Sequence, residues 1–367
     1  MLKSLPSMDV AGRIPRVRDR FAGAGIEALL VTRLPNVQYL TGFTGSAATV
    51  LLTATDALLV TDGRYKDQSA EQIAASGAPA RVGVGTTQNK QSEILREAAV
   101  GIERLGLEAH GVSWAQQRAF GDWFPDAELV PTEHLVEDFR MVKDAGEVAR
   151  VQAACAIADD ALAEVLPSLR DQPTERDFAL RLEFAMRERG ASAVSFDPIV
   201  ASGPNGAKPH ARPSDRTIAP NQLVVIDFGC IVEGYCSDMT RTVSVGDPGP
   251  EARHVWDTVL LAQQAGRAAV AVGVECAAVD KACRDIIDDA GWGDAFVHGT
   301  GHGVGLEIHE DPRVAASAGG TLAPGHVVTV EPGVYLPGVG GVRIEDTVVV
   351  TADGPVALTE FPKDLVL

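Results

Sequence analysis

The C-terminal part of the chain places two acidic residues on either side of a glycine-containing turn, and then does so again. The first pair is Asp227, in Val-Val-Ile-Asp-Phe-Gly, and Asp238, in Ser-Asp-Met-Thr-Arg-Thr. The second pair is Glu331, in Val-Thr-Val-Glu-Pro-Gly, and Glu345, in Arg-Ile-Glu-Asp-Thr-Val. All four acids interrupt apolar, β-branched runs that are typical of buried strands. This repeat predicts two similar halves whose acids meet at a pseudo-twofold axis.

Each acidic pair follows a pair of predicted helices. Asp144 starts the first helix with a capping-box pattern, and Thr174 caps the second. Another helix pair, whose first member is expected over 251–272, precedes the second acidic pair. A unit of two helices followed by strands therefore occurs twice, at residues 144–246 and 251–352. We expect both helix pairs to pack on one face of a shared antiparallel sheet, with the acids at its centre.

Residues 1 to about 140 have a different pattern, in which short apolar runs alternate with amphipathic stretches. This pattern is typical of α/β layers, and a chain of 367 residues is too long for one ordinary core. We predict an N-terminal domain over 1–140, with a framing or gating role, and a catalytic domain over 141–367. In the first domain, strands are expected at 28–32, 47–52, 57–60, 81–84 and 128–130, and helices at 13–24, 64–76, 90–99 and 114–123.

Charge and cysteine content narrow the range of partners and compartments. The net charge is −18, from 32 basic and 50 acidic residues, which argues against nucleic acid or an anionic membrane as a partner. No apolar run approaches the roughly 18 residues that span a bilayer, and the first residues lack the apolar region of a signal peptide. The five cysteines include no Cys-x-x-Cys pair, and their odd number suits a reducing compartment. We expect a soluble cytoplasmic protein.

The four repeated acids have the chemistry of a metal site. The turn between Asp227 and Asp238 is expected at 229–234, so two antiparallel strands would place both carboxylates on one face. The second acidic pair supports the same argument independently. Carboxylates held this close repel one another, and four negative charges match two divalent cations. His302 is the fifth expected ligand.

This donor set, with carboxylate oxygens and one imidazole, favours Mn²⁺ or Co²⁺, with Fe²⁺ or Zn²⁺ as alternatives. A structural zinc site would instead be dominated by thiolates. Two ions about 3.5 Å apart can activate a bridging water and polarise a carbonyl, as in phosphatases and aminopeptidases. No phosphate-binding cluster of Arg and Lys accompanies the acids. Amide hydrolysis is therefore favoured, with a phosphatase-like hydrolase as an alternative.

The segment His298-Gly-Thr-Gly-His302 partly resembles two other kinds of site. Its histidine spacing is that of a zinc-binding helix, but the three interspersed glycines disfavour a helix and no Glu follows His298. The glycines also fail to match a nucleotide-binding fingerprint. Neither interpretation is supported.

Several other residues near the acids have simpler interpretations. His210 alone would be a surface or core histidine, and only its match to His309 in the second copy makes it a site candidate. The remaining predictions concern the core: buried thiols at Cys230 and Cys236, and core aromatic residues at Phe196, Trp292 and Tyr335, the last also a candidate pocket wall.

The combined motifs resemble those of the pita-bread metallopeptidases, and most closely the Xaa-Pro peptidases, aminopeptidase P and prolidase. These motifs are IDFG, SDMTRT, HGTGHGVG, HEDP, VTVEPGVY and VRIEDT. The N-terminal segments NVQYLTGFTGS and TDGRY are similar to the creatinase-like domain of that family. The resemblance covers nearly the whole chain. It implies a mixed α/β (α+β) fold, with a creatinase-like domain before a pita-bread domain of duplicated halves.

The resemblance also implies a role for each proposed ligand. Asp227 would bind one metal ion, and His302 and Glu331 would bind the other. Asp238 and Glu345 would bridge the two ions. Glu331 would in addition transfer protons.

Four further residues take roles from the same resemblance. His298 and His309 would steady the substrate carbonyl and the tetrahedral intermediate. His210 would lie near the leaving group, and Arg343 would orient a bridging carboxylate. These are the predicted catalytic residues besides Glu331.

The implied activity is hydrolysis of short peptides with proline in the second position, by a homodimer that uses two Mn²⁺ ions. A methionine-aminopeptidase-like or broader aminopeptidase is an alternative, although methionine aminopeptidase normally lacks the leading domain. Creatinase uses no metal, and a metal-free binding protein would be expected to have lost ligands that are present here. A dipeptidase needs a cation for the substrate carboxylate, and Arg212 and Arg313 are both candidates. The choice between dipeptidase and aminopeptidase stays open.

Overall fold

The computed structural model describes residues 5–367 and divides them into two compact units. One unit is Ser7–Arg140, and the other consists of Met141–Leu367 together with Leu5 and Pro6. Each unit has its own apolar core. Within the described part of the chain, no helix has the length and apolar character needed to cross a membrane.

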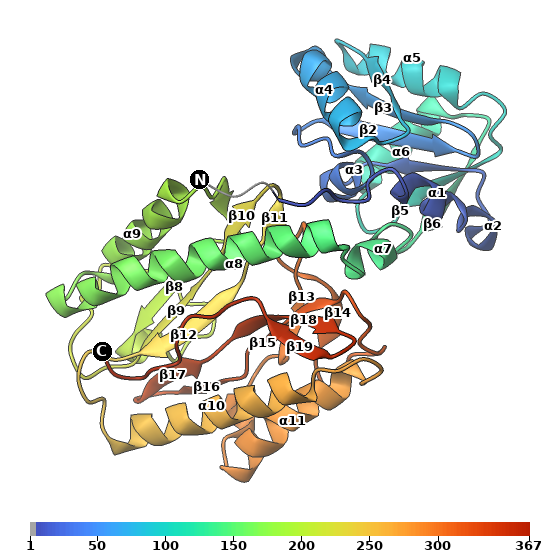
Figure 1. Ribbon diagram of the computed structural model, residues 1–367. Helices are drawn as coiled ribbons and strands as arrows, with labels where there is room; N and C mark the ends of the chain where they lie inside the picture. The colour runs from blue at the N-terminus through green and yellow to red at the C-terminus, as the bar shows by residue number, and fades with distance from the viewer. Residues whose placement is uncertain (1–4) are drawn as a thin grey trace. The chain divides into compact units, whose positions relative to one another are not determined.

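The first unit is built on one six-stranded mixed sheet with the strand order β4-β3-β2-β1-β5-β6 (Figure 1). Strands β1 and β3 are buried along their whole length, as expected of strands covered on both faces. The strands are β1 (Ala28–Val31), β2 (Ala48–Thr53), β3 (Ala57–Thr61), β4 (Arg81–Val84), β5 (Arg104–Glu108) and β6 (Glu128–Thr132). The helices are α1 (Arg13–Arg18), α2 (Phe21–Ala24), α3 (Leu34–Thr41), η1 (Gly63–Tyr65), α4 (Lys66–Ser76), α5 (Gln88–Ala98), α6 (Trp114–Trp123) and α7 (Glu137–Met141).

Most of the predicted elements of this unit are present, and the differences are local. The helix predicted over 13–24 is two short helices, α1 and α2. Strand β5 was not predicted, because Gly106 weakens its short apolar pattern. The glycine is required by packing, since a Cβ there would lie 2.8 Å from the side chain of Ile26. Helix α3 was also missed; it has a proline in its first turn, where proline is tolerated.

The first half of the second unit begins with the predicted helix pair, α8 (Ala145–Val165) and α9 (Glu175–Glu188), joined by η2 (Leu166–Asp171). The capping box at Asp144 is confirmed, and the Thr174 side chain caps α9. The apolar faces of both helices form one core with the following strands. These are β7 (Ala193–Val194), β8 (Ile199–Ser202), β9 (Val224–Phe228), β10 (Cys230–Val232), β11 (Tyr235–Cys236) and β12 (Met239–Val243), with η3 (Gly203–Asn205) after β8.

The second half repeats this plan with α10 (Pro250–Ala269), α11 (Cys276–Asp289) and η4 (Gly293–Ala295). Helix α10 ends three residues before the predicted 272, because Val270 already has an extended backbone. The helices share a second core with strands of this half. The strands are β13 (Gly301–Gly303), β14 (Glu310–Val314), β15 (Val327–Val330), β16 (Gly333–Leu336), β17 (Gly340–Arg343), β18 (Asp346–Thr351) and β19 (Gly354–Ala357).

The strands of the second unit do not form the single shared sheet that was expected. Within the described residues they pair as β12-β9-β8, β14-β13-β15-β18-β19, β11-β10-β7 and β16-β17. The halves are joined where β12 meets the chain between β17 and β18: the Glu345 N–H donates to the Thr240 carbonyl at 3.1 Å. In Figure 1, α8 and α9 accompany the strands of the first half, and α10 and α11 those of the second.

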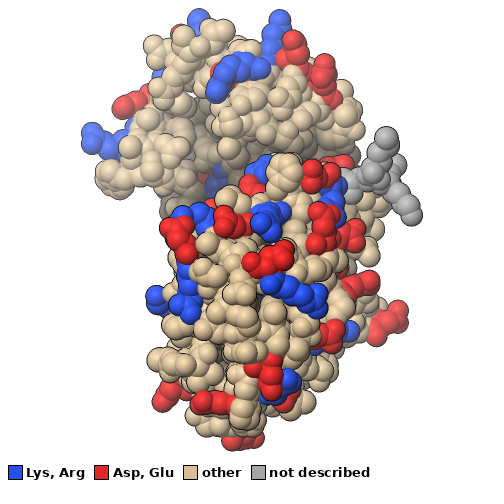
Figure 2. All heavy atoms as spheres, turned by 90° about the vertical axis from the view of Figure 1, so that its left-hand side faces the viewer, with Lys and Arg blue, Asp and Glu red and all other residues tan. Residues whose placement is uncertain are grey.

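Charges of both signs are mixed on the surface. On the face drawn in Figure 2, acidic and basic side chains are interspersed and do not form a broad basic patch. Several exposed acids are paired with an arginine or lysine, as in Lys281–Asp285 and Arg253–Asp247. Such exposed pairs contribute little stability individually.

Candidate metal centre

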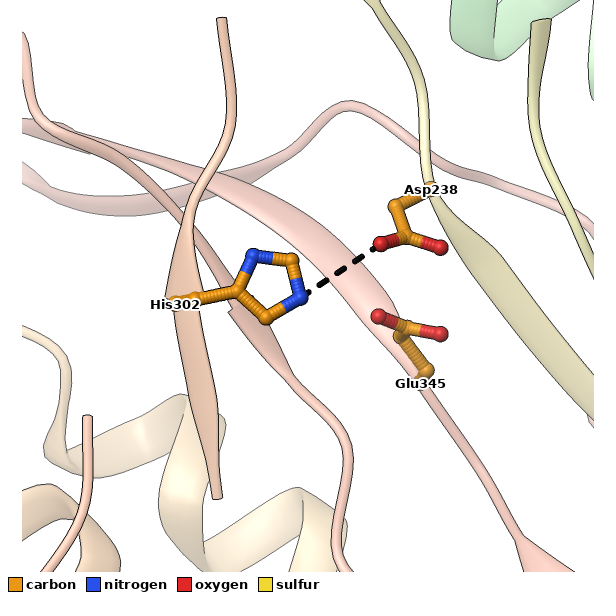
Figure 3. Close-up of side chains that lie close together, drawn as sticks. All are labelled: Asp238, His302 and Glu345. Carbon is orange, nitrogen blue, oxygen red and sulfur yellow. Dashed lines mark ion pairs between the residues drawn. The ribbon is translucent and has the colours of Figure 1, made fainter. Parts of the chain in front are cut away.

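Three side chains from distant parts of the second unit meet at its centre. Asp238, His302 and Glu345 each offer one ligand atom, and these atoms lie within 4.8 Å of one another. All three residues are buried. Figure 3 shows the His302 ring pointing toward the two carboxylates, which come from two separate segments of the chain. The structure therefore brings together acids from both copies of the sequence repeat.

The first acidic pair is placed by strands β9 and β12, but not by one continuous hairpin. In this ladder Asp227 is the partner of Thr240, so Asp238 lies just before β12 begins. The turn is tighter than expected: Val232 pairs with Tyr235, and β10 and β11 form a separate small ladder with β7. The residues around the turn, 230–236, are therefore not part of the β9–β12 ladder, which ends close to the acids.

The second acidic pair is placed in the same way. Val330 pairs with Asp346 in the β15–β18 ladder, so Glu331 and Glu345 are the next residues beyond its end. The hairpin of β16 and β17 then begins with Gly333 opposite its partner on β17. In both halves, the acids therefore lie close to the place where one ladder ends and another begins; Asp227 is in the last but one pair of its ladder, and the other three are beyond a ladder end.

His302 occupies the middle of the short strand β13, between two glycines. A Cβ at Gly301 would lie 2.0 Å from the Thr329 carbonyl oxygen, so only glycine allows this close approach of strands. His302 Nδ1 lies 3.0 Å from the Gly303 carbonyl oxygen, which can only accept, so Nδ1 carries the hydrogen. Nε2 therefore faces the acids, as a metal ligand would. The glycines place His302 on a strand and not on a zinc-binding helix.

The imidazole of His302 contacts acids from both halves. Its Nε2 lies 3.3 Å from Glu331 Oε1 and 3.6 Å from Asp238 Oδ2. Burial raises the pKa of Glu331, but the hydrogen bond and charge of His302 outweigh burial and lower it to about 2. Burial lowers the pKa of His302, and its contacts with Glu331 reverse this and raise it. These two groups thus stabilise each other's charged forms.

The other three acids are held in a way that disfavours their negative charges. Burial raises the pKa of Asp227, and the Arg343 guanidinium opposes that shift. Burial and repulsion between carboxylates raise the pKa values of Asp238 and Glu345 well above their usual range. A cation placed among these groups would reverse the effect, because it favours the ionised carboxylates.

Unpartnered oxygen atoms support the same conclusion. Asp227 Oδ1 and Glu345 Oε1 are buried and have no hydrogen-bond partner in the described structure. An unpartnered buried polar atom is costly, and such atoms commonly mark the place of an ion or a water molecule. Carboxylate oxygens with one imidazole nitrogen suit hard or borderline divalent ions. The residues present therefore fit a divalent metal site.

Arg343 connects the acids of the first half to residues of the second. Its guanidinium donates to Asp227 Oδ2, and to the hydroxyl oxygens of Tyr335 at 2.7 Å and Thr240 at 3.1 Å. The Thr240 hydroxyl in turn donates to Glu345 Oε2 at 2.6 Å. Arg343 therefore reaches the predicted bridging acid Glu345 through a threonine and contacts Asp227 directly.

His298 is held at both ring nitrogens. Nδ1 lies 2.8 Å from the Gly299 carbonyl oxygen and so donates to it, while Nε2 accepts from the Tyr335 hydroxyl at 2.8 Å. Arg284 donates to the backbone carbonyl of His298 at 2.9 Å and pairs with the buried carboxylate of Asp280. His298 is thus part of a continuous hydrogen-bonded chain with Tyr335 and Arg343.

His210 and His309 have no such attachment. Both are exposed, and neither ring forms a hydrogen bond to another residue among 5–367. His309 packs edge-on against His302, with ring centroids 4.3 Å apart. Although the residue is exposed overall, partial desolvation of the ring and the nearby His302 lower the pKa of His309, so its neutral form is favoured. The two histidines that match in the repeat are therefore the ones available to a bound molecule.

A cavity of about 490 Å³ lies over the acids, a size typical of small-molecule sites. All nine predicted site residues line it, and every lining residue belongs to the second unit. Phe196 also lines it and is only partly buried, so its assignment to the core was wrong. Tyr335 is buried, as predicted, while Trp292 is only partly buried and packs against the second core. Cys230 and Cys236 are buried free thiols, as predicted.

Two threonines that hold the acids were not predicted from the sequence. Thr240 follows Asp238 by two residues, and Thr347 follows Glu345 by two. The Thr240 hydroxyl donates to the Glu345 side chain, and the Thr347 hydroxyl donates to the Asp238 carbonyl at 2.7 Å. Each half thus supports the acid of the other half. The repeated acid-x-Thr pattern was visible in the sequence and was the available signal.

Comparison with known proteins gives a consistent result. The chain matches the profile of metallopeptidase family M24 over residues 149–352, and that of the creatinase/prolidase N-terminal domain over residues 13–142. It is 34% identical to an Xaa-Pro dipeptidase of Pyrococcus horikoshii, over 93% of this chain and 95% of that one. The structure of an Xaa-Pro dipeptidase from Bacillus anthracis is 37% identical, with a TM-score of 0.93 over 98% of this chain and 100% of that one. An X-Pro aminopeptidase structure from Thermotoga maritima is 35% identical, with a TM-score of 0.87 over 94% and 98% of the two chains.

Proposed function

The chain belongs to metallopeptidase family M24, and we propose that it hydrolyses the bond before proline in Xaa-Pro dipeptides and short peptides with proline second. The family membership confirms the predicted fold class, a creatinase-like α/β domain followed by a pita-bread domain. We propose the boundaries 1–140 and 141–367 for these domains. The proposal rests above all on the centre in which Asp238, His302 and Glu345 converge on one point.

We assign five ligands to two divalent ions, proposed to be Mn²⁺, with Co²⁺ or Zn²⁺ as alternatives. When bound, the ions would supply Lewis acidity that activates a water molecule and polarises the scissile carbonyl. Unpartnered oxygens on Asp227 and Glu345 support this assignment, as does the pKa of Asp238, which burial and repulsion from neighbouring carboxylates raise well above its usual range. The ligands are Asp227, Asp238, His302, Glu331 and Glu345.

Glu331 is the ligand that we assign to proton transfer. Its side chain is 17% exposed, compared with 12% for Asp227 and 6% for Asp238. Among these three acids it therefore has the best access to a bound substrate. Its Oε1 accepts a hydrogen bond from the Thr329 hydroxyl at 3.2 Å and lies 3.3 Å from His302 Nε2. Positioned acid–base groups of this kind contribute roughly 10²–10⁴-fold to a rate.

We assign a different role to each histidine according to its contacts. His309 and His210 line the cavity with unengaged rings, so we assign them direct contact with the substrate carbonyl and with the leaving-group side, respectively. Both nitrogens of His298 are occupied, so its role is to hold Tyr335 in place. Arg343 fixes Asp227 and Tyr335, and through Thr240 it fixes Glu345.

This arrangement suits a bond that precedes proline. The nitrogen of such a bond is a tertiary amide and carries no N–H, so an enzyme cannot recognise it through that donor. A site that holds the carbonyl side through cations and imidazoles does not need the donor. The free substrate amine would lie near the acids, which restricts cleavage to the first residue.

The two candidate cations for a substrate carboxylate are not equivalent. Arg212 is already paired with Asp197 at 3.1 Å, and both side chains are largely exposed. Arg313 lines the same cavity and forms no ion pair with any acid within 5–367. We therefore propose that Arg313 binds the C-terminal carboxylate and that the enzyme is a dipeptidase in preference to an aminopeptidase.

The test is hydrolysis of Ala-Pro, Ala-Pro amide and Ala-Pro-Ala by EDTA-treated protein after addition of Mn²⁺. We expect metal-restored cleavage of Ala-Pro and much weaker cleavage of the other two. Arg313→Ala should raise KM for Ala-Pro roughly 10-fold, as loss of a charged hydrogen bond would, and leave the amide unaffected, whereas Arg212→Ala should change little. Release of alanine from Ala-Pro-Ala at a similar rate would favour an aminopeptidase.

Other activities fit the observations less well. A methionine-aminopeptidase-like enzyme would not explain the N-terminal unit, which matches the creatinase/prolidase domain. A metal-free binding protein would not need the buried cluster of Asp238, His302 and Glu345. Cleavage of neither proline substrate, with Mn²⁺ bound, would contradict the specificity and leave a general aminopeptidase as the alternative.

We also propose a cytoplasmic homodimer. The five buried free thiols suit a reducing compartment. Light scattering on the purified chain should give about twice 38.6 kDa. A mass of one chain would contradict the dimer.

A further inference from the structure

The loop after strand β8 carries His210 to the cavity but has little regular structure of its own. After η3 it continues through turns and bends to residue 216, with no helix or strand in the described structure. Four consecutive residues of this loop, 209–212, line the cavity. A loop without backbone ladders usually samples several conformations unless other contacts hold it. The contacts that hold this loop therefore decide where His210 lies.

Both ends of the loop are bound to one buried carboxylate, that of Glu175. Oε1 accepts from the backbone N–H and the hydroxyl of Ser202, at 2.7 and 2.8 Å. Oε2 accepts from the backbone N–H and the hydroxyl of Ser214, at 3.1 and 2.6 Å. The Asn205 amide donates to both oxygens, at 3.2 and 3.0 Å. One side chain thus closes the base of the loop.

Glu175 is 0% exposed, and no arginine, lysine or histidine pairs with it in the described residues. Its charge is instead stabilised by these N–H and O–H donors and by its place in the first turn of the 14-residue helix α9. The same helix end also binds the loop backbone. Glu175 N–H donates to the Arg216 carbonyl at 3.0 Å, and Arg176 N–H to the Ser214 carbonyl at 3.1 Å.

The middle of the loop contacts residues next to the candidate metal centre. Arg343 donates to the Pro209 carbonyl at 3.2 Å. Gly206 lies so close to β17 that a Cβ at Gly341 would be 1.9 Å from the Gly206 carbonyl oxygen. The loop is therefore fixed at its centre by the site and at its base by Glu175, and His210 lies between these two attachments.

We propose that Glu175 is a positioning residue, which sets His210 for catalysis by closing the base of the 202–216 loop. This inference rests on the proposed peptidase function for its kinetic consequence, but its structural consequence can be measured without activity. Glu175 touches neither the cavity nor a proposed ligand. Its effect on the reaction should therefore pass through His210.

The variant Glu175→Gln tests this directly. The amide keeps the shape of the side chain but presents an NH₂ group to donors that need an acceptor, so one end of the loop is released. In hydrogen exchange with mass spectrometry, amides of 202–216 should exchange faster than in the unaltered protein, while those of 296–305 stay unchanged. The kcat/KM for Ala-Pro should fall roughly 10- to 100-fold, as expected when a catalytic group is misplaced.

A double-mutant cycle separates positioning from general loss of structure. If Glu175 acts through His210, the Glu175→Gln, His210→Ala double variant should be within about two-fold of His210→Ala alone. Asp280→Asn is the matched control, because this buried acid of α11 binds Thr300 near His298 instead. The reduction in kcat/KM caused by Asp280→Asn should multiply with the reduction caused by His210→Ala in the double variant.

The outcomes are distinct. The proposal would be overturned if the reductions in kcat/KM caused by Glu175→Gln and His210→Ala multiply in the double variant. It would also be overturned if the amides of 202–216 exchange no faster in Glu175→Gln than in the unaltered protein. Absence of Xaa-Pro hydrolysis by the unaltered protein would instead reject the proposed function. In that case, an unchanged rate of hydrogen exchange in Glu175→Gln would still refute the proposed role of Glu175 in closing the loop. Faster hydrogen exchange confined to residues 202–216 would support it.

Discussion

The two halves of the catalytic unit present their acids at matching places, yet supply different partners. In the first half, Asp227 is held by Arg343, a residue of the second half. In the second half, Glu331 is held by His302 from its own half, and Glu345 by Thr240 from the first. The repeat therefore explains where the acids stand but not how their charges are balanced.

The distribution of basic groups sharpens this contrast. Of the basic residues assigned to the site, the first half contributes His210, and the second contributes Arg313, Arg343 and three histidines. The first half alone could not balance its own acids, because Asp227 relies on Arg343 from the second half. A duplicated backbone can therefore build a two-sided site whose polar contacts are asymmetric.

The largest expected effect comes from removing an acid from either half. Asp238→Ala and Glu345→Ala should each lower kcat/KM at least on the order of 10³-fold, because each would remove a ligand from a centre worth several kcal/mol. Mn²⁺ binding by calorimetry should be lost in parallel. Asp289→Ala, at an exposed position of α11, is the control. If either variant kept a tenth of the native kcat/KM, the proposal that the metal centre needs acids from both halves would be wrong.

A smaller effect should separate the two threonines that look equivalent in sequence. Thr240 bonds a ligand carboxylate, so Thr240→Val should weaken Mn²⁺ binding roughly 10- to 100-fold. Thr347 bonds a backbone carbonyl, so Thr347→Val should leave affinity nearly unchanged and lower the free energy of unfolding by about 1 kcal/mol. Calorimetry and thermal unfolding measure the two quantities. Equal losses of affinity would show that the halves are symmetric after all.

The smallest expected effect concerns the protein without metal. The pKa of Asp238 is raised by burial and by repulsion from Glu345, across the boundary between halves. Stability from a raised carboxyl pKa is present below the unfolded value, about 4, and is lost as the pH rises through the folded value. EDTA-treated protein should therefore lose stability as the pH rises above about 4.

Asp238→Asn removes this charge, so the EDTA-treated variant should be more stable than the treated native chain at pH 8. The expected rise in Tm is roughly 2–4 °C for each kcal/mol of relieved repulsion in a unit of this size. With Mn²⁺ present, the order should reverse, because only the native chain keeps all its ligands. A variant that is less stable in both conditions would contradict repulsion between the halves.

Much of the fold was predictable because it is encoded locally. The capping box at Asp144, the cap at Thr174 and the strand around Asp227 each depend on a few adjacent residues. The strand β5 was missed where a glycine demanded by packing interrupted the pattern. Phe196 was assigned to the core because apolar character alone does not distinguish a core from a cavity wall.

By itself, the sequence determined the repeat, the identity of the convergent acids and His302, and the exclusion of a zinc helix by the interspersed glycines. These follow from spacing and from backbone preferences that act over a few residues. Only the tertiary structure decided the partners of the acids: Arg343 bonds Asp227 across 116 residues, and Thr240 bonds Glu345 across 105. Glu175, which closes the His210 loop, gave no signal in the sequence either. Contacts this distant depend on how two halves and a helix end pack together, and no local pattern specifies that packing.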